Sequence, residues 1–368
     1  MTNVDQATRR RFTRTGLTAL DTNLASHGFT LYTPGGGDGT VYLVDINGEN
    51  VHTWKMPYPP GLYGYLLPDG NLFYNGQTPD TEPEERFPNW RRFKGGVMQV
   101  ADWDGNIIWE HYDPDHHHDA RRTDTGGAIY LTVERVPEEL AARVKGGVAG
   151  SDARGMWADV IVEVDSEGNR IWEWQAKDHL DTNLDVLTYN DSREEWSHGN
   201  TVVPIAGNRV LASFRNISTV VIIDKKTGEI VWRLGHDTLS QQHDPSMLDN
   251  GNILIYDNGA YRKTVPMPAS RVIEVDPSTN EIVWEYKDSM PPSFFSAYIS
   301  GARRLSNGNT LITEGITGRM FQVTSDGDVV WEYTNPHWQT RADGTVFNNV
   351  FRANHYMAEE IPALSQGH

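Results

Sequence analysis

The sequence of 368 residues contains no cysteine, which excludes disulfide bridges, thiolate metal sites and cysteine nucleophiles. It also lacks an uninterrupted apolar run long enough to span a bilayer. Positive charge is scarce: 32 Lys and Arg residues against 50 Asp and Glu residues give a net charge of −18. This balance argues against nucleic acid or an anionic membrane as partner. We therefore expect a small-molecule substrate, and the sequence leaves the oligomeric state open.

Adjacent arginines near the start, at Arg9–Phe12, resemble part of a twin-arginine export signal. Such a signal needs an apolar segment after the arginines, and the sequence TRTGLTALDTN that follows is not apolar enough. The sequence therefore predicts a cytoplasmic protein.

Six short apolar segments each end in a tryptophan that follows a tight turn. Each segment reads as strand, turn and strand, with Asp, Asn or Gly in the turn, which is typical of a β-hairpin. The tryptophans are 47 to 63 residues apart, namely Trp54, Trp109, Trp172, Trp232, Trp284 and Trp331. A repeat of this period, with one aromatic residue per hairpin, favours an all-β fold, a six-bladed β-propeller.

A second hairpin lies between successive tryptophan hairpins, so that each blade has four strands with the tryptophan on the outermost one. Five blades are complete in the sequence, and the sixth is split between the chain ends. Residues 28–54 would supply three of its strands, and residues 348–360 would supply the inner strand and close the ring. The alternative is that residues 18–25 form that inner strand.

We interpret residues 1–368 as one propeller domain with three insertions, at 76–95, 135–157 and 175–196. The second insertion contains PEELAARVKGG, a sequence typical of a short helix with proline in its first turn and glycine after its end. Long loops on a rigid scaffold commonly carry function, so these insertions are expected to cover one face of the propeller.

Histidine recurs at one register of the predicted inner strands. His118 and His243 each lie eight residues before the glycine of the next turn, and His198 lies nine residues before Gly207. Inner strands of a propeller surround its axis, so we expect these imidazoles to meet at one height. The C-terminal strand would bring His355 close to the same level.

Imidazoles in a partly closed site can act as general acid, general base or nucleophile. Without a carboxylate at the same register, the three could also bind a divalent metal ion, with His118, His198 and His243 as ligands. No other cofactor is indicated.

Histidine and arginine together can instead bind a tetrahedral oxyanion. The cationic candidates for substrate binding are Arg215, Arg262 and Arg319. For Arg319, at the start of a strand, a structural link between strands is the alternative. Tyr298 is a candidate proton donor or ring contact, with packing within the blade as its alternative.

The stretch from His198 to Arg271 resembles the arylsulfotransferase family of bacterial six-bladed propellers. The matching motifs occur in order as His198-Gly199-Asn200, Ser213-Phe214-Arg215, Trp232-Arg233-Leu234-Gly235, Gln242-His243, Asp257-Asn258-Gly259 with Arg262, and Ser270-Arg271. The resemblance implies transfer of a sulfuryl group from an aryl sulfate to a phenol through a sulfated histidine. It further implies that His198, His243 and Arg262 hold the sulfate group, and it places Asn200 in the family's His-x-Asn motif.

The chain departs from this family at one position. The residue aligned with the family's nucleophilic histidine is Arg319, and no histidine occurs between His243 and His337. The nucleophile would then be His355 or His118, or transfer would be direct.

Three functions remain open from the sequence. The first is an arylsulfotransferase-like enzyme acting on an aryl sulfate or a similar oxyanion. The second is a lyase or hydrolase, with or without a metal ion, in which the same histidines perform acid–base chemistry while arginine stabilises negative charge. The third is a propeller that binds a ligand without catalysis.

Overall fold

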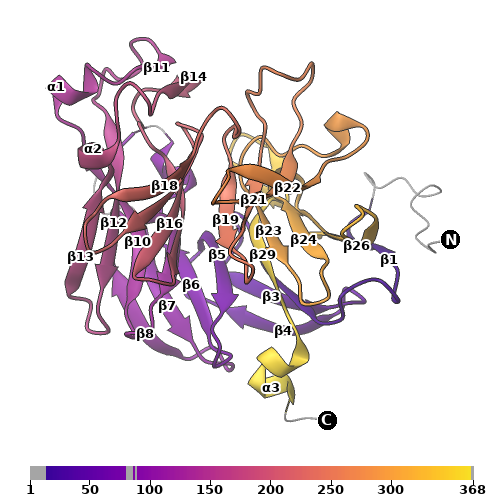
Figure 1. Ribbon diagram of the computed structural model, residues 1–368. Coiled ribbons are helices and arrows are strands. Elements are labelled where there is room, and N and C mark those ends of the chain that lie inside the picture. Colours follow the sequence, from indigo (N-terminus) through magenta and orange to yellow (C-terminus); the bar gives the residue numbers. More distant parts are fainter. Residues whose placement is uncertain (1–13, 80–85, 88, 366–368) are drawn as a thin grey trace.

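The computed structural model describes residues 14–79, 86–87 and 89–365. Within these ranges six antiparallel sheets are arranged as the blades of a β-propeller (Figure 1), as the tryptophan repeat predicted. The Arg9–Phe12 stretch lies outside the described residues. No helix among those described has the length and apolar character needed to cross a membrane.

The blades are numbered along the chain, and their strands are given from the axis outward. Blade 1 consists of β29 (Val350–Tyr356), β2 (Phe29–Pro34), β3 (Thr40–Asp45) and β4 (Asn50–Lys55). Blade 2 consists of β5 (Pro60–Leu66), β6 (Leu72–Gln77), β7 (Gly96–Ala101) and β8 (Ile107–Tyr112). Blade 3 consists of β9 (His117–Arg122), β10 (Ala128–Arg135), β12 (Trp157–Val164) and β13 (Arg170–Gln175).

The second half of the ring repeats this pattern. Blade 4 consists of β15 (Gly199–Ile205), β16 (Arg209–Phe214), β17 (Thr219–Asp224) and β18 (Ile230–Leu234). Blade 5 consists of β19 (His243–Met247), β20 (Ile253–Asp257), β21 (Arg271–Asp276) and β22 (Glu281–Tyr286). Blade 6 consists of β23 (Ser300–Arg304), β24 (Thr310–Glu314), β25 (Arg319–Val323), β26 (Val329–Thr334) and a fifth strand, β1 (Gly16–Leu20).

Blade 1 joins the two ends of the described chain. The C-terminal β29 pairs antiparallel with β2, with Phe29 opposite Tyr356 and Leu31 opposite Asn354. In Figure 1 the yellow β29 therefore belongs to the same sheet as the indigo β3 and β4. The alternative that residues 18–25 supply the inner strand is wrong, because β1 pairs with the outer strand β26 of blade 6.

The repeated tryptophan has a defined role between blades. Each of the six indoles donates a hydrogen bond of 2.8–3.0 Å to the turn between the third and fourth strands of the next blade. The series ends with Trp331 of blade 6, which donates to the carbonyl of Ile46 in blade 1. The sequence repeats at this position because every blade makes the same contact.

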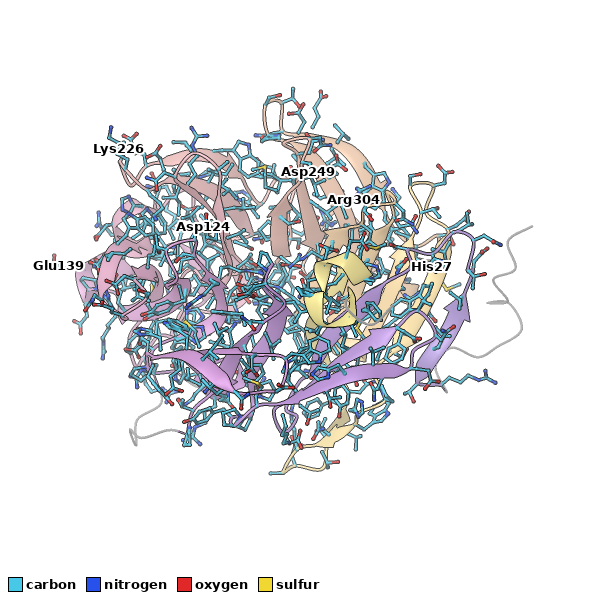
Figure 2. All side chains as sticks on the ribbon, turned by 90° about the horizontal axis from the view of Figure 1, so that it is seen from below. His27, Asp124, Glu139, Lys226, Asp249 and Arg304 are labelled. Carbon is cyan, nitrogen blue, oxygen red and sulfur yellow. The ribbon has the colours of Figure 1, made fainter. Side chains whose placement is uncertain are left out.

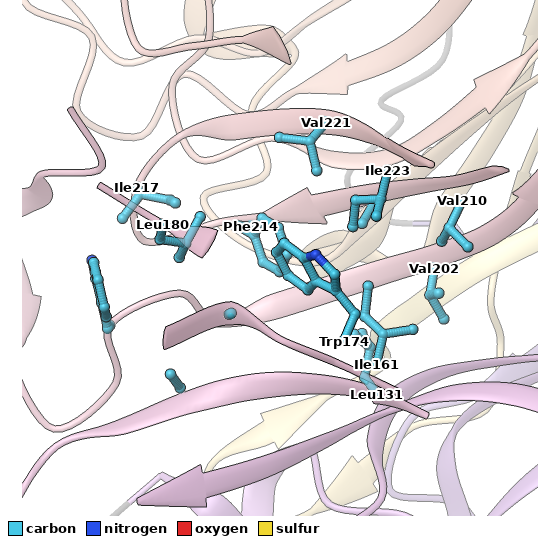
Figure 3. Packing of buried hydrophobic residues seen from close by; sticks show 14 of the residues in the cluster. Leu131, Ile161, Trp174, Leu180, Val202, Val210, Phe214, Ile217, Val221 and Ile223 are labelled. Carbon is cyan, nitrogen blue, oxygen red and sulfur yellow. The ribbon is translucent and has the colours of Figure 1, made fainter. Parts of the chain in front are cut away.

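The apolar core consists of layers between neighbouring blades. The layer between blades 3 and 4 includes Leu131, Ile161, Trp174, Val202 and Phe214 (Figure 3). The rings of Trp174 and Phe214 stack with their centroids 5.8 Å apart. Similar layers fill the other five interfaces. Each blade is therefore held on both faces, which makes the inner strands a rigid support.

The insertions form small elements outside the blades. They contain the short helices α1 (Glu138–Ala141) and α2 (Ala176–His179), the 3₁₀ turn Trp90–Arg92, and the strands β11 (Gly146–Val148) and β14 (Leu187–Ser192), which pair in parallel. Helix α1 lies within the sequence PEELAARVKGG, as predicted. The elements α1, β11 and β14 lie at one end of the molecule, and α3 (Pro362–Ser365) lies at the other (Figure 1).

Two further features complete the fold. A small hairpin of β27 (Gln339–Thr340) and β28 (Val346–Phe347) precedes β29. Figure 2 views the protein from below and labels Asp124 and Asp249, which lie in the turns that follow the inner strands β9 and β19.

Candidate active site: a histidine cluster at the propeller axis

His118, His198 and His243 come from three successive blades and form one cluster. His118 is the second residue of β9, His243 is the first residue of β19, and His198 directly precedes β15. The rings of His118 and His198 lie edge to face with their centroids 4.7 Å apart. Phe351 of β29 contacts the rings of both His118 and His243, at 6.2 and 6.4 Å. Residues of blades 1, 3 and 5 meet only at the axis, where the histidine register places this cluster.

The insertion at 76–95 covers two of these rings. Phe93 stacks on His118 with 4.4 Å between ring centroids and meets His198 edge to face at 4.9 Å. The backbone of both histidines is in the left-handed region, with φ of 51° at His118 and 52° at His198. This conformation costs about 1–3 kcal/mol for a residue other than glycine and is found mostly at functional sites. Here it turns both side chains toward the shared cluster.

Two of the imidazoles are oriented by acceptors at Nδ1. Nδ1 of His198 lies 2.7 Å from Oε1 of Glu195, a carboxylate that accepts the hydrogen bond. Nδ1 of His243 lies 2.8 Å from Oδ1 of Asn258. Nδ2 of Asn258 donates to the carbonyl of Ser296 at 2.7 Å, which identifies Oδ1 as the atom facing His243. Nδ1 therefore carries the proton in both histidines.

The third imidazole is in contact with its neighbour in sequence, since Nδ1 of His118 lies 2.8 Å from Nδ1 of His117. In the described part of the chain, Nε2 of His118, His198 and His243 has no hydrogen-bond partner. The side chains of His118 and His243 are buried. The cluster thus contains three Nε2 atoms that have no partner among the described residues.

Burial and neighbouring charge keep two of the rings neutral. Burial lowers the pKa of His118 well below its usual range, and the proximity of His198 and His117 lowers it further. Burial also lowers the pKa of His243 well below its usual range, and the positive charge of Arg215 acts in the same direction. A neutral imidazole with a free nitrogen is both a base and a nucleophile.

His355 is not part of the cluster, so the predicted level of this residue is wrong. Like the other inner strands, β29 has its first residues at the cluster, and its second residue is Phe351. His355 is the sixth residue of the strand, and its Nδ1 lies 3.5 Å from Oγ1 of Thr30 in the neighbouring strand. The register argument placed His355 near the start of β29, whereas it lies near the end of that strand.

The three arginine candidates differ in what they contact. Arg319 is buried between Glu314 and Glu332, with Nε donating to Glu332 at 2.7 Å, so it links strands and does not reach the cluster. Arg262 forms an ion pair with Asp257 and donates to a backbone carbonyl at 3.0 Å.

Arg215 is the arginine candidate whose charge acts on a histidine of the cluster. Its Nη1 donates to Oδ1 of Asn216 at 3.0 Å and lies 3.5 Å from Oδ1 of Asp191, while its Nε is buried without a hydrogen-bond partner. Its charge acts on His243, as described above. This arginine therefore places a positive charge near the cluster, although its Nε is buried.

The two remaining candidates lie at different depths. Asn200 is buried, and its Nδ2 donates to the carbonyl of Gln242 at 2.9 Å, which ties blade 4 to blade 5. Its amide is therefore occupied by a structural contact. Tyr298 lies in the loop before β23, and its side chain is 44% exposed.

A metal ion does not fit this arrangement. Among the described residues, no group of three or more histidine, cysteine, aspartate or glutamate side chains is placed to hold a metal ion. The rings of His118 and His198 stand edge to face beside Phe93. These side chains do not form the divalent metal site considered from the sequence.

Several residues of the site were not predicted. Carboxylates are present, contrary to expectation: Glu195 contacts His198, and Asp159 lies 3.1 Å from Nε2 of His117. Phe93 and Glu195 both lie in insertions that the sequence assigned to one face of the propeller. Their place in those insertions was the available signal, but only the folded loops show which side chains reach the histidines.

Below the histidines, a network of buried charges fills the axis. Arg352 of β29 contacts Asp119 of β9 and Asp244 of β19, each at 3.0 Å. Arg303 also pairs with Asp244, and Tyr63 donates a hydrogen bond to Asp119. The cluster is therefore closed on this side by charged groups.

The six blades form a β-propeller, and the histidine cluster is a polar site at its axis. The chain belongs to the arylsulfotransferase family, because the family model described as "Arylsulfotransferase (ASST)" matches residues 90–336. The match includes the whole of blades 3 to 5 and therefore all three histidines of the cluster. The comparison with curated proteins gives no match.

Solved structures that resemble the chain have little sequence in common with it. A protein of unknown function from Bacteroides caccae is 12% identical, with a TM-score of 0.54 over 89% of this chain and 98% of that one. A streptogramin B lyase is 13% identical, with a TM-score of 0.49 over 93% of each chain. A catalytically inactive virginiamycin B lyase from Staphylococcus aureus is 11% identical, with a TM-score of 0.47 over 87% of this chain and 88% of that one. The first of these likenesses supports the fold and nothing further.

Proposed function

We propose that the protein is a sulfuryl-transfer enzyme whose substrate is a small aryl sulfate and whose nucleophile is His118. The observation that carries this proposal is the common orientation of the cluster, in which Nδ1 of each ring is engaged and Nε2 is free. Family membership supplies the reaction class. His118 is preferred over His355 because His355 lies at the other end of its strand.

In the first step, the lone pair on Nε2 of His118 attacks the sulfur of the aryl sulfate. An N–S bond forms, the bond between sulfur and the aryl oxygen breaks, and its electron pair stays on the aryl oxygen. Protonated His198, held at Nδ1 by Glu195, donates its Nε2 proton to that oxygen. The leaving group departs as a neutral phenol.

In the second step, the hydroxyl oxygen of an acceptor phenol attacks the same sulfur. The N–S bond breaks, and its electron pair returns to Nε2 of His118. His198 accepts the proton of the phenol and is ready for another cycle. Transfer through a histidine thus needs one nucleophile and one acid–base group in contact, and the two rings are 4.7 Å apart.

The negative charge of the sulfuryl group requires positive partners. The guanidinium of Arg215 places a positive charge near His243. A bound sulfate would also favour the protonated form of His243, which can then donate from Nε2 to a sulfate oxygen. Phe93 and Phe351 supply apolar surface for the aryl ring.

The proposal is tested with 4-nitrophenyl sulfate, with and without phenol as acceptor. We expect nitrophenol release that depends on phenol, and loss of turnover in His118→Gln. Without acceptor, the intact mass of the protein should increase by one sulfuryl group, and this increase should be absent from His118→Gln. His236→Gln, at a surface histidine, is the matched control. Undiminished turnover by His118→Gln rules out the assigned nucleophile.

The same pair of rings also favours a second candidate, a lyase. A neutral His118 in contact with a carboxylate-bound His198 is an acid–base pair that can remove one proton and deliver another. Such a reaction forms no covalent adduct. Failure to observe both nitrophenol release and the sulfuryl mass would favour this candidate over the transferase.

A further inference from the structure

His117 adjoins the cluster without presenting a free nitrogen to it. Its Nε2 lies 3.1 Å from Oδ1 of Asp159 and 3.4 Å from the carbonyl oxygen of Thr132. Both neighbours can only accept a hydrogen bond when Asp159 is ionised, so Nε2 of His117 must carry a proton. The other nitrogen, Nδ1, lies 2.8 Å from Nδ1 of His118.

Asp159 is held in place by the segment that also supplies His198. Oδ2 of Asp159 accepts hydrogen bonds from the hydroxyl of Ser197 and, at 2.8 Å, from the backbone N–H of Gly199. A Cβ atom at Gly199 would lie only 2.6 Å from Oδ1 of Asp159, so the close approach of the carboxylate requires glycine here. These contacts leave Oδ1 directed at His117.

The ionised state of Asp159 follows from its surroundings. Burial raises the pKa of this carboxyl, but the proximity of His117 and the hydrogen bonds from Ser197 and Gly199 outweigh burial, and the net shift is downward. Oδ2 accepts the hydrogen bonds from Ser197 and Gly199. Oδ1 is buried without a hydrogen bond of its own and lies at ion-pair distance from Nε2 of His117.

We infer that Asp159 and His117 are positioning residues that hold His118 in the tautomer protonated at Nδ1, with the lone pair on Nε2. A neutral imidazole carries a single N–H, and that of His117 is at Nε2. Nδ1 of His117 is therefore an acceptor, and the proton in its contact with His118 belongs to Nδ1 of His118. This tautomer leaves His118 with the lone pair that a nucleophile needs. The catalytic part of the inference rests on the proposed function.

The opposite tautomer would place a proton on the atom that has to attack sulfur. It would arise if His117 carried a second proton and donated from Nδ1. Nε2 of His117 donates to the carbonyl of Thr132, and the ring lies beside those of Trp90 and Phe93, with centroids 5.8 and 6.1 Å away. Protonation of both nitrogens of His117 is the one alternative that the ¹⁵N measurement below has to exclude.

Asp159→Asn is designed to exchange the donor and acceptor nitrogens of His117 and, through it, those of His118. Because Ser197 and Gly199 both donate to the Oδ2 position, the amide oxygen of the new side chain should occupy it, and the NH₂ group should face Nε2 of His117. Nε2 then accepts, Nδ1 of His117 donates, and His118 becomes protonated at Nε2. The substitution changes the direction of the hydrogen bonds at almost constant volume.

The first measurement is ¹⁵N NMR of histidine-labelled protein without substrate, with His118 assigned through the loss of its signals in His118→Gln. We expect Nε2 of His118 to be unprotonated in the wild-type protein and protonated in Asp159→Asn. A wild-type His118 with its proton on Nε2 overturns the inference. Because no substrate is present, this result is independent of the proposed reaction.

The second measurement is the kcat of the same variants with 4-nitrophenyl sulfate. We expect Asp159→Asn to lose roughly 10²-fold or more, as expected when the wrong nitrogen carries the proton. Asp185→Asn, which changes another buried aspartate that pairs with Arg233 away from the cluster, is the control and should retain activity. Unchanged kcat in a variant with a reversed tautomer overturns the positioning role. The wild-type protein could also show the lone pair on Nε2 of His118 and yet have no sulfuryl-transfer activity. That result would leave the tautomer assignment intact and would contradict only the proposed function.

Discussion

Arg352 lies with its Nη1 atom 3.0 Å from Oδ2 of Asp119, and both side chains are fully buried. The same guanidinium contacts Asp244 at 3.0 Å and donates to the carbonyl of Asn200 at 2.6 Å. It therefore joins the inner strands of blades 1, 3, 4 and 5 below the histidine cluster. Arg303 and Arg121 supply further positive charge to these two carboxylates, at Asp244 and Asp119 respectively.

Replacing Arg352 by Met should destabilise the protein by about 3–5 kcal/mol, because it removes the buried guanidinium that Asp119 and Asp244 share. The free energy of unfolding is measured by urea denaturation. Arg170→Met is the control, since Arg170 and Glu173 form a half-exposed ion pair at 2.9 Å whose loss should cost at most about 1 kcal/mol. Equal midpoints for the two variants would contradict a stabilising role for the axial network.

Under the proposed function, Glu195→Gln should reduce the kcat for 4-nitrophenyl sulfate by about 10-fold or more, because the carboxylate accepts from Nδ1 of His198 and so orients the ring that delivers the proton. Glu194→Gln is the matched control: the neighbouring residue contacts Arg154 at 3.2 Å and does not contact a histidine of the cluster. Comparable losses in both variants would point to a disturbed loop and not to proton transfer.

Stability should decrease as the pH falls below about 6.5, the usual pKa of an imidazole in an unfolded chain. Burial lowers the pKa of His355 in the folded protein to about 4. Between these two values the unfolded state binds a proton that the folded state does not, so the stability is full above about pH 6.5 and is lost toward pH 4. His355→Gln should reduce the slope of the unfolding free energy in this window by about 1.4 kcal/mol per pH unit.

The slope is obtained from urea denaturation at several pH values within that window. His236→Gln serves as the control, because the side chain of His236 is largely exposed and its replacement should leave the slope unchanged. Parallel curves for the wild-type protein and His355→Gln would show that His355 is protonated equally in both states.

The fifth strand of blade 6 offers a matched pair of positions. Val330, directly before Trp331 in β26, is 0% exposed because β1 covers this edge, whereas Val231, directly before Trp232 in β18, is 47% exposed. Val330→Ala should cost about 2 kcal/mol through lost burial, and Val231→Ala less than about 0.5 kcal/mol. Both values come from urea denaturation, and a small cost at both positions would mean that β1 contributes no packing.

The repeat of tryptophan and turn residues was sufficient to predict the six blades, because every indole makes the same short-range contact with the next blade. The sequence also predicted the shared register of His118, His198 and His243, whose counting from the following turn does not depend on the length of the inner strand, which ranges from five to seven residues. His355 was misplaced for a physical reason: its distance from the start of β29 could not be counted without knowing where that strand begins.

Local periodicity was enough to predict the number of blades, their strand order and the blades on which His118, His198 and His243 lie. The side chains that complete the site follow from the three-dimensional packing. Glu195 and Phe93 reach the histidines through irregular insertions, and Arg352 meets Asp119 and Asp244 across the axis. Such contacts depend on the path of loops and on the packing of distant strands, and neither leaves a periodic trace in the sequence.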